Sequence, residues 1–111
     1  MCWMSYRVEA TDLFIKRLKP LLKKYPSLLT DLKSLNQQLA ETPRQGDGLG
    51  HGCYKVRLAI RSKNTGKSDG ARIITLVQVV DEQVLLLTIY DKSERDNLQP
   101  GELEVLLKML E

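Results

Sequence analysis

The stretch CYKVRLAIRSKNTGKSDGARIITLVQVVDEQVLLLTIYDKSER, residues 53–95, decides the fold of this chain. Apolar and polar side chains alternate strictly at its start: the apolar set is Val56, Leu58 and Ile60, and the cationic set is Lys55, Arg57 and Arg61. Period-two alternation is typical of a strand that buries one face and exposes the other. We therefore expect a strand that lines the core with one face and displays cations on the other.

Two further strands are expected after this one. A polar loop at residues 62–70 carries Lys63 and Lys67, and the next strand, residues 71–80, opens with Arg72. A short turn at residues 81–83 then leads into a strand at residues 84–90. The last two strands are apolar on both faces for much of their length, which favours a place at the centre of the sheet.

The residues before this stretch predict a strand followed by two helices. Residues 3–9 (WMSYRVE) indicate a short strand, and Thr11 is a natural N-cap for the helix after it. Pro20 removes a backbone hydrogen bond from that helix and is expected to kink or divide it. A second helix follows Pro26 and ends before Pro43. Its apolar stripe consists of Leu28, Leu32, Leu35 and Leu39.

The remaining segments complete an α+β fold. Residues 43–52 (PRQGDGLGHG) hold four glycines and are expected to form a loop, and a last helix begins near Pro100. The order β-α-α-β-β-β-α predicts a small antiparallel-type sheet with a helical hairpin packed on one face. With 111 residues, the chain is expected to form one domain, residues 1–111.

Composition argues against several classes of protein. The two cysteines, Cys2 and Cys53, belong to no CxxC motif or Cys/His cluster, so neither a disulfide framework nor a metal site is expected, and no cofactor is implied. No apolar run approaches membrane-spanning length, and the amino terminus lacks a basic segment followed by an apolar one. We expect a cytoplasmic protein with no membrane partner.

Positive charge is concentrated in one part of the chain. Residues 44–72 hold seven Lys or Arg against two Asp, a local balance of +5, whereas the whole chain carries +3. The rest of the chain is therefore net negative. A concentration of cations of this kind suggests a site for an anionic partner.

Several short motifs occur in an order that resembles the RelE/ParE/HigB superfamily of bacterial toxins, and RelE- and HigB-type members in particular. They are CYKVRL at residues 53–58, the basic glycine loop with GAR at residues 70–72, and LLLTIYDKSE at residues 85–94. The resemblance covers nearly the whole chain and implies a RelE-like fold. It also implies cleavage of messenger RNA in the ribosomal A site and neutralisation by a cognate antitoxin. Partners would be mRNA, the small ribosomal subunit and that antitoxin.

The resemblance places the active-site cations on Lys55, Arg57, Arg72 and Lys92, with Tyr90 nearby. Cleavage of RNA by its own 2′-hydroxyl requires a base, stabilisation of a dianionic phosphorane and an acid for the 5′-oxygen. Arginine pairs bidentately with phosphate oxygens, so Arg57 and Arg72 suit the stabilising role without a metal. Lys55 is the candidate base, because nearby guanidinium groups disfavour its ammonium form. Lys92 or Tyr90 is the candidate acid.

Arg61, Lys63 and Lys67 are candidate RNA-binding residues along the path towards this site. Each candidate also has a plainer interpretation. The strand cations are equally compatible with a solvated face, and the loop lysines with solubility. Tyr90 is compatible with packing at the sheet edge. His51, the single histidine, lies in the glycine loop and matches no active-site position.

The loop departs from the charge pattern of related toxins in two places. Close members often read SKGKGKSGGAR where this chain has SKNTGKSDGAR, so Thr65 replaces a lysine and Asp69 a glycine. Both changes lower the positive charge beside the expected RNA path and weaken phosphate attraction. Two alternatives stay open: a ParE-like inhibitor of DNA gyrase, which shares the fold, and a catalytically inactive member that binds RNA or the ribosome.

Overall fold

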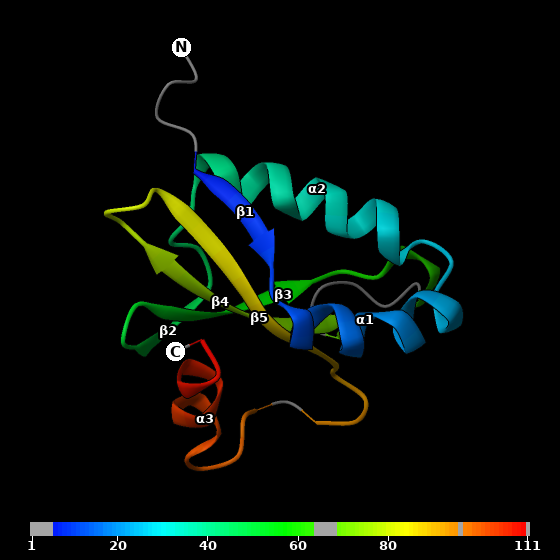
Figure 1. Ribbon diagram of the computed structural model, residues 1–111. Helices are drawn as coiled ribbons and strands as arrows, with labels where there is room; N and C mark the ends of the chain where they lie inside the picture. The colour runs from blue at the N-terminus through cyan, green and yellow to red at the C-terminus, as the bar shows by residue number, and fades with distance from the viewer. Residues whose placement is uncertain (1–5, 64–68, 96, 111) are drawn as a thin grey trace.

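The computed structural model describes residues 6–63, 69–95 and 97–110 (Figure 1). Within these residues the elements are β1 (Arg7–Ala10), α1 (Asp12–Lys24), α2 (Leu28–Glu41), β2 (Asp47–Gly50), β3 (Cys53–Leu58), the short 3-10 helix η1 (Arg61–Lys63), β4 (Ala71–Gln78), β5 (Gln83–Asp91) and α3 (Glu102–Lys108). The α+β class expected from the sequence is confirmed.

The strands form one sheet in the order β1-β5-β4-β3-β2. Strands β2 to β5 pair antiparallel with their neighbours, whereas β1 lies parallel to β5 at the sheet edge. The two apolar strands, β4 and β5, therefore each have a partner on both sides, as the sequence predicted. A strand inside a sheet that is covered on both faces needs apolar residues on both of its own faces.

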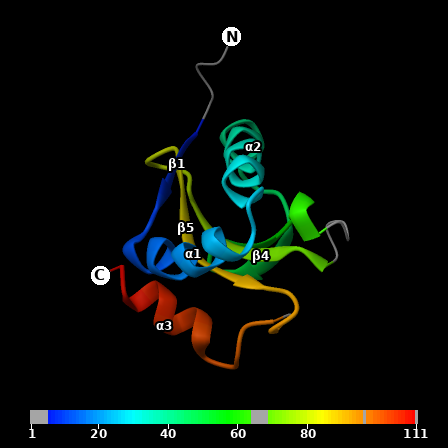
Figure 2. The ribbon, with the colours of Figure 1, turned by 90° about the vertical axis from the view of Figure 1, so that its right-hand side faces the viewer.

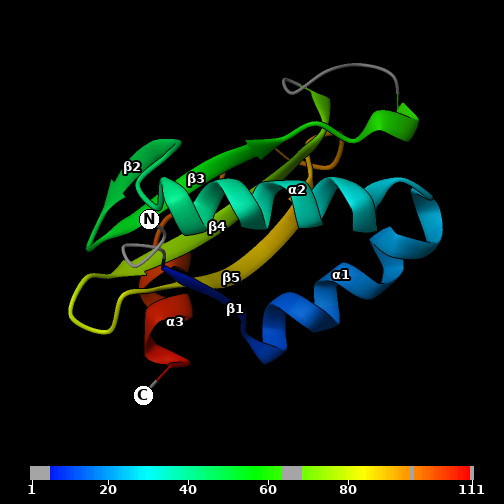
Figure 3. The same cartoon turned by 90° about the horizontal axis from the view of Figure 1, so that it is seen from above.

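Helices cover both faces of the sheet. Helices α1 and α2 pack on one face, where Phe14 and Leu39 meet Ile73 and Ile89 in the larger core. Helix α3 packs on the other face, where Leu106 belongs to a second apolar cluster with residues of β4 and β5. Figure 2 shows α3 separated from α2 by the sheet, and Figure 3 shows α2 lying in front of the strands.

The two expected helices of the hairpin are present. Thr11 caps α1, since its Oγ1 accepts a hydrogen bond from the Phe14 N–H at 3.3 Å. Pro20 does not divide the helix, which continues to Lys24. Lys16, whose carbonyl loses its intrahelical partner, and Pro20 are both exposed, so water can solvate that carbonyl.

Several boundaries differ from the sequence-based expectation. Residues 47–50, expected to be loop, form edge strand β2, because its pairing with β3 uses backbone groups and tolerates glycine. The alternating strand ends at Leu58, so Arg61 lies in η1 rather than on the strand face. The first strand spans Arg7–Ala10, and the earlier part of the expected strand lies mostly outside the described residues.

No helix in the described ranges combines the length and the apolar character needed to cross a membrane.

Candidate active site

Three adjacent strands bring four of the expected residues to one face of the sheet. Arg57 on β3 lies directly opposite Arg72 on β4, and Arg72 lies opposite Tyr90 on β5. Lys55 is two residues before Arg57 and therefore shares its face. These four residues, Lys55, Arg57, Arg72 and Tyr90, are called the cationic row below. Tyr90 belongs to the apolar cluster of Leu106, so the row lies on the α3 side of the sheet.

The members of the cationic row differ in exposure. Arg57 is exposed and Lys55 is half-buried, whereas Arg72 is 2% and Tyr90 6% exposed. A guanidinium Nη1 of Arg72 donates to the Ala71 carbonyl oxygen at 3.3 Å. An incoming polyanion therefore meets Arg57 and Lys55 before it meets the buried end of the row.

The segment between β5 and α3 contacts the row through Asn97 and Arg95. The Lys55 Nζ donates to Asn97 Oδ1 at 2.7 Å, and the Arg95 guanidinium lies 4.5 Å from the centroid of the Tyr90 ring. Arg95 also donates two hydrogen bonds to Glu102, at 2.7 and 2.9 Å. The Arg95 hydrogen bonds hold the pKa of Glu102 below its usual value, against the opposing effect of burial. The start of α3 is thereby tied to the Tyr90 end of the row.

Lys92 directly follows β5. Its backbone N–H donates to the Gly70 carbonyl oxygen at 3.0 Å, which places it beside the start of β4 and two residues from Arg72 along that strand. Lys92 is half-buried. It is therefore positioned at the end of the cationic row rather than within it.

Asp91, the residue between Tyr90 and Lys92, is a buried polar hub that the sequence analysis did not identify. Its carboxylate accepts hydrogen bonds from the Tyr25 hydroxyl, from the Lys63 Nζ at 2.8 Å and from the Ser93 N–H at 3.0 Å. The Lys24 Nζ lies 3.8 Å away. One carboxylate thus joins the end of α1, η1 and the end of β5, the elements that frame the buried end of the row.

The hydrogen bonds to Asp91 stabilise its charged form. Burial by itself raises the pKa of this carboxyl group, but the donors from Lys63, Tyr25 and Ser93 outweigh burial and hold the pKa far below its ordinary value. Asp91 is 1% exposed and makes its contacts as an anion. The group is therefore suited to structural support and not to accepting a proton at neutral pH.

The three candidate RNA-binding residues are not placed alike. Lys63 contacts Asp91 and donates to the Asp69 carbonyl oxygen at 2.5 Å, so its ammonium group serves contacts within the protein. Arg61 is exposed and lies 3.6 Å from the buried Asp31 carboxylate. Lys67, like Thr65, lies outside the described residues. Neither Arg61 nor Lys63 belongs to the cationic row.

Several hollows lie on the described surface, and two of them include Arg57 at the exposed end of the row. A groove of about 340 Å³ is lined by Gln45, Gly46, Asp47, Lys55, Val56 and Arg57. A smaller groove of about 180 Å³ lies between α2 and the end of β3, and Gln45, Arg57 and Arg61 belong to its lining. Arg57 and Gln45 border both. A third groove, about 460 Å³, lies between α1 and the end of β5 and includes Tyr90 and Arg95.

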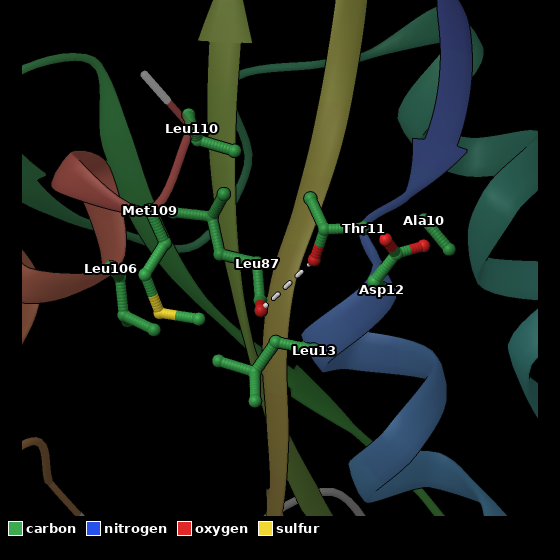
Figure 4. Close-up of a pocket in the computed structure, with 8 residues that line it drawn as sticks. All are labelled: Ala10, Thr11, Asp12, Leu13, Leu87, Leu106, Met109 and Leu110. Atoms are coloured by element: carbon green, nitrogen blue, oxygen red, sulfur yellow. Dashed lines mark hydrogen bonds between the residues drawn. The ribbon is translucent and has the colours of Figure 1, made fainter.

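Another hollow is apolar and separate from the cations. It has a volume of about 440 Å³ and lies between the start of α1, β5 and α3, where Leu13, Leu87 and Leu106 approach one another (Figure 4). Its polar members are Thr11, whose hydroxyl bonds to backbone carbonyls of β5, and Asp12. With no cation in its lining, this groove does not suit a phosphate.

Other kinds of catalytic group are scarce in the part of the chain that the structure describes. No group of three or more His, Cys, Asp or Glu side chains is arranged there to hold a metal ion. Cys53 is 1% exposed, and burial raises its pKa to about 11, so its thiolate is not populated at neutral pH.

Sequence reasoning overlooked several residues of this region. Asp91, Arg95 and Asn97 lie in or beside the charged run DKSERDN, which has no periodic pattern, and Gln45 and Asp47 lie in the glycine-rich segment. A carboxylate at the end of an apolar strand was the one available signal, and it pointed to Asp91. The partners of the other residues come from distant segments, so local sequence carries no sign of them.

Comparison with known proteins identifies relatives of this fold. The model of the RelE family, described as the RelE toxin of the RelE/RelB toxin–antitoxin system, matches residues 24–111. A mutant of the Escherichia coli toxin RelE in the free state is 18% identical, with a TM-score of 0.57 over 94% of this chain and 92% of that one. The toxin–antitoxin complex RelBE2 from Mycobacterium tuberculosis is 15% identical, with a TM-score of 0.59 over 78% of this chain and 98% of that one. No curated protein matches.

Proposed function

Because this chain belongs to the RelE toxin family, we propose that it is a ribosome-dependent mRNA endoribonuclease, the toxin of a type II toxin–antitoxin pair. The observation that supports the activity is the cationic row, in which two arginines lie opposite each other on neighbouring strands. We further propose that it acts in the cytoplasm, where its substrate would be mRNA held by the small ribosomal subunit.

In the proposed reaction, the RNA supplies its own nucleophile. Lys55 in its neutral form accepts the proton of the 2′-hydroxyl, and the 2′-oxygen forms a bond to phosphorus. Arg57, the exposed arginine, pairs with the phosphate oxygens, and Arg72, 2% exposed beside it, adds positive charge that stabilises the developing negative charge. The bond to the 5′-oxygen then breaks, and that oxygen takes a proton from Tyr90 or Lys92. The products are a 2′,3′-cyclic phosphate and a free 5′-hydroxyl.

Asn97 supports the position of the proposed base. It accepts the hydrogen bond of Lys55 at 2.7 Å, which holds the amine near Arg57 instead of leaving it free in solvent. An amide oxygen makes this contact without adding negative charge next to an RNA phosphate.

The proposed partner that silences the toxin is an antitoxin protein. One of the similar solved structures is a toxin–antitoxin complex, and this chain carries its own excess positive charge in residues 44–72. An acidic or amphipathic segment that covers the cationic row would block access to RNA.

The experiment that tests the activity compares two arginine substitutions of equal charge change. The chain is induced in a bacterial host, and the 5′-ends of an abundant transcript are mapped by primer extension. We expect cuts within translated codons for the wild type. Arg57→Ala is expected to lower cleavage by about 100-fold or more, since it removes a transition-state donor. Arg44→Ala, which removes an exposed arginine outside the row, is expected to leave the cuts in place.

Two other outcomes would redirect the assignment. Growth arrest with DNA damage and no RNA cuts would favour a ParE-like gyrase inhibitor. Soluble protein without arrest or cuts would identify an inactive RNA- or ribosome-binding member of the family. Circular dichroism of both variants separates a loss of chemistry from a loss of fold.

A further inference from the structure

The groove beside the exposed end of the cationic row contains polar groups that phosphate chemistry does not require. Its lining combines Lys55 and Arg57 with Gln45 and Asp47, and its volume is about 340 Å³. That volume is within the range of small-molecule sites, roughly 300–1,000 Å³. The carboxylate of Asp47 would repel a further phosphate of the RNA. The groove is therefore better suited to another part of the nucleotide.

The backbone holds Asp47 on the face of the sheet that carries the cationic row. Asp47 is the register partner of Lys55 in the β2–β3 pair, and residues directly opposite on antiparallel strands share a face. Its side chain is exposed. Within the described residues no basic nitrogen lies within 4.0 Å of its carboxylate, so the group is not consumed by a salt bridge.

Gly46 fixes the distance between this segment and β3. It has a φ of +96°, and a Cβ at this position would lie 2.4 Å from the Lys55 carbonyl oxygen. Only glycine allows the chain to pass so close to the strand. The groups on either side of it, Gln45 and Asp47, are therefore held against the row.

Gln45 presents a mixed donor and acceptor group to the same groove. Its Nε2 donates to the Thr42 carbonyl oxygen at 3.1 Å, which orients the amide and leaves the second N–H and the oxygen for a ligand. Gln45 and Arg57 border both this groove and its smaller neighbour. A ligand group bound here would lie next to the phosphate held by Arg57.

A nucleobase fits this set of groups better than a phosphate or a sugar does. Carboxylates accept hydrogen bonds from base amino groups, and glutamine amides pair with adenine through one donor and one acceptor. Adenine, cytosine and guanine each carry an exocyclic amino group, whereas both exocyclic groups of uracil are carbonyl oxygens and its one donor on the pairing edge, the N3–H, lies between them. A carboxylate in this place therefore favours bases that carry an exocyclic amino group.

We infer that Gln45 and Asp47 form a base-selecting subsite that takes the nucleotide adjoining the scissile phosphate and disfavours uracil there. This inference rests on the proposed nuclease function, because the subsite selects where the cationic row cuts.

The test is a transcriptome-wide map of 5′-hydroxyl ends in cells that express the wild type, Asp47→Asn or Gln45→Ala. Base frequencies at each position around the cut are normalised to all cuts in that sample, so that a change in overall rate does not affect the result. We expect uracil to be depleted at one adjoining position in the wild type. Asp47→Asn supplies an amide donor in place of an acceptor and is expected to raise the uracil frequency there by about fivefold. Gln45→Ala is expected to alter the same position.

Asp81→Asn is the matched control. It removes the same charge from the exposed β4–β5 turn and should reproduce the wild-type base frequencies. If the wild type cuts RNA but Asp47→Asn leaves the frequencies unchanged, the subsite is wrong and the nuclease assignment stands. A uniform loss of cuts without a change in frequency also overturns the subsite, because Asp47 would then act on Lys55 or on folding. If the wild type makes no cuts, both proposals fail together.

Discussion

Gly70 illustrates how a single residue positions the cationic row. A Cβ at this position would lie 1.9 Å from the Leu58 carbonyl oxygen, a backbone atom that cannot move without moving the end of β3. Gly70 also accepts the hydrogen bond from the Lys92 N–H. Two backbone segments therefore meet here, two residues from Arg72.

Substitution of Gly70 by alanine is expected to disturb both stability and the site. Gly70→Ala must push β3 and β4 apart and should cost about 1–3 kcal/mol or more. Chemical denaturation of the purified chain measures this cost. Gly48→Ala is the control, because its Cβ would make an ordinary contact at 3.9 Å with Tyr54. An equal stability loss in the two variants would show that loss of glycine itself, and not the close approach to Leu58, is responsible.

At the scale of elements, α3 is held to the sheet by packing and by the polar contacts of Glu102. Leu106 is buried in the apolar cluster with Ile74 and Leu87, while the Arg95–Glu102 pair ties the first turn of α3 to Tyr90. Glu102 also accepts from the Gln99 N–H at 2.8 Å. A seven-residue helix has little stability of its own, so these contacts decide whether it forms.

Glu102→Gln is expected to loosen α3. The change weakens the bidentate pair with Arg95 and should raise amide hydrogen exchange in α3 by about fivefold, corresponding to about 1 kcal/mol for a partly exposed pair. Glu104→Gln is a close control, since it removes the same charge from the same helical turn and leaves Arg95 paired. Equal exchange rates in the two variants would assign the effect to the helix dipole.

The sequence was informative wherever a pattern reflects burial. Period-two alternation predicted β3, and the leucine stripe predicted α2, because both patterns report which side faces the core. The same alternation wrongly extended the strand to Arg61. Ile60 is buried and so continues the apolar pattern, although the strand has already ended at Leu58. Strand β2 was missed because its pairing depends on backbone groups that leave no side-chain pattern.

The candidate site was likewise predicted only in part. Arg57 and Arg72 were predicted together from the resemblance and now lie opposite each other in the register. Asp91 could not be predicted as a hub, because its partners Tyr25 and Lys63 are 66 and 28 residues away in the chain. Contacts between buried polar groups depend on tertiary placement, which local sequence does not encode.

At the scale of the whole molecule, Asp91 couples folding to pH. Its pKa in the folded state lies below the value of about 3.9 that an unfolded chain gives an aspartate. The unfolded state therefore binds the proton more readily, and acid favours unfolding. The stability that Asp91 contributes is fully present above roughly pH 4 and is lost as the pH falls towards the lower value of the folded state.

Urea unfolding of the wild type and Asp91→Asn between pH 7 and pH 2.5 tests this coupling. At pH 6 the variant should be less stable by on the order of 2 kcal/mol, because hydrogen bonds to a charged buried acceptor are weakened. The difference should shrink below roughly pH 4, because the wild type loses its Asp91 contribution and the variant has none to lose. Asp81→Asn, in an exposed turn, should match the wild type within about 0.5 kcal/mol throughout. If the difference in unfolding free energy between the two proteins stays constant down to pH 2.5, Asp91 contributes through shape and packing. Its charge would then not be what joins α1, η1 and β5.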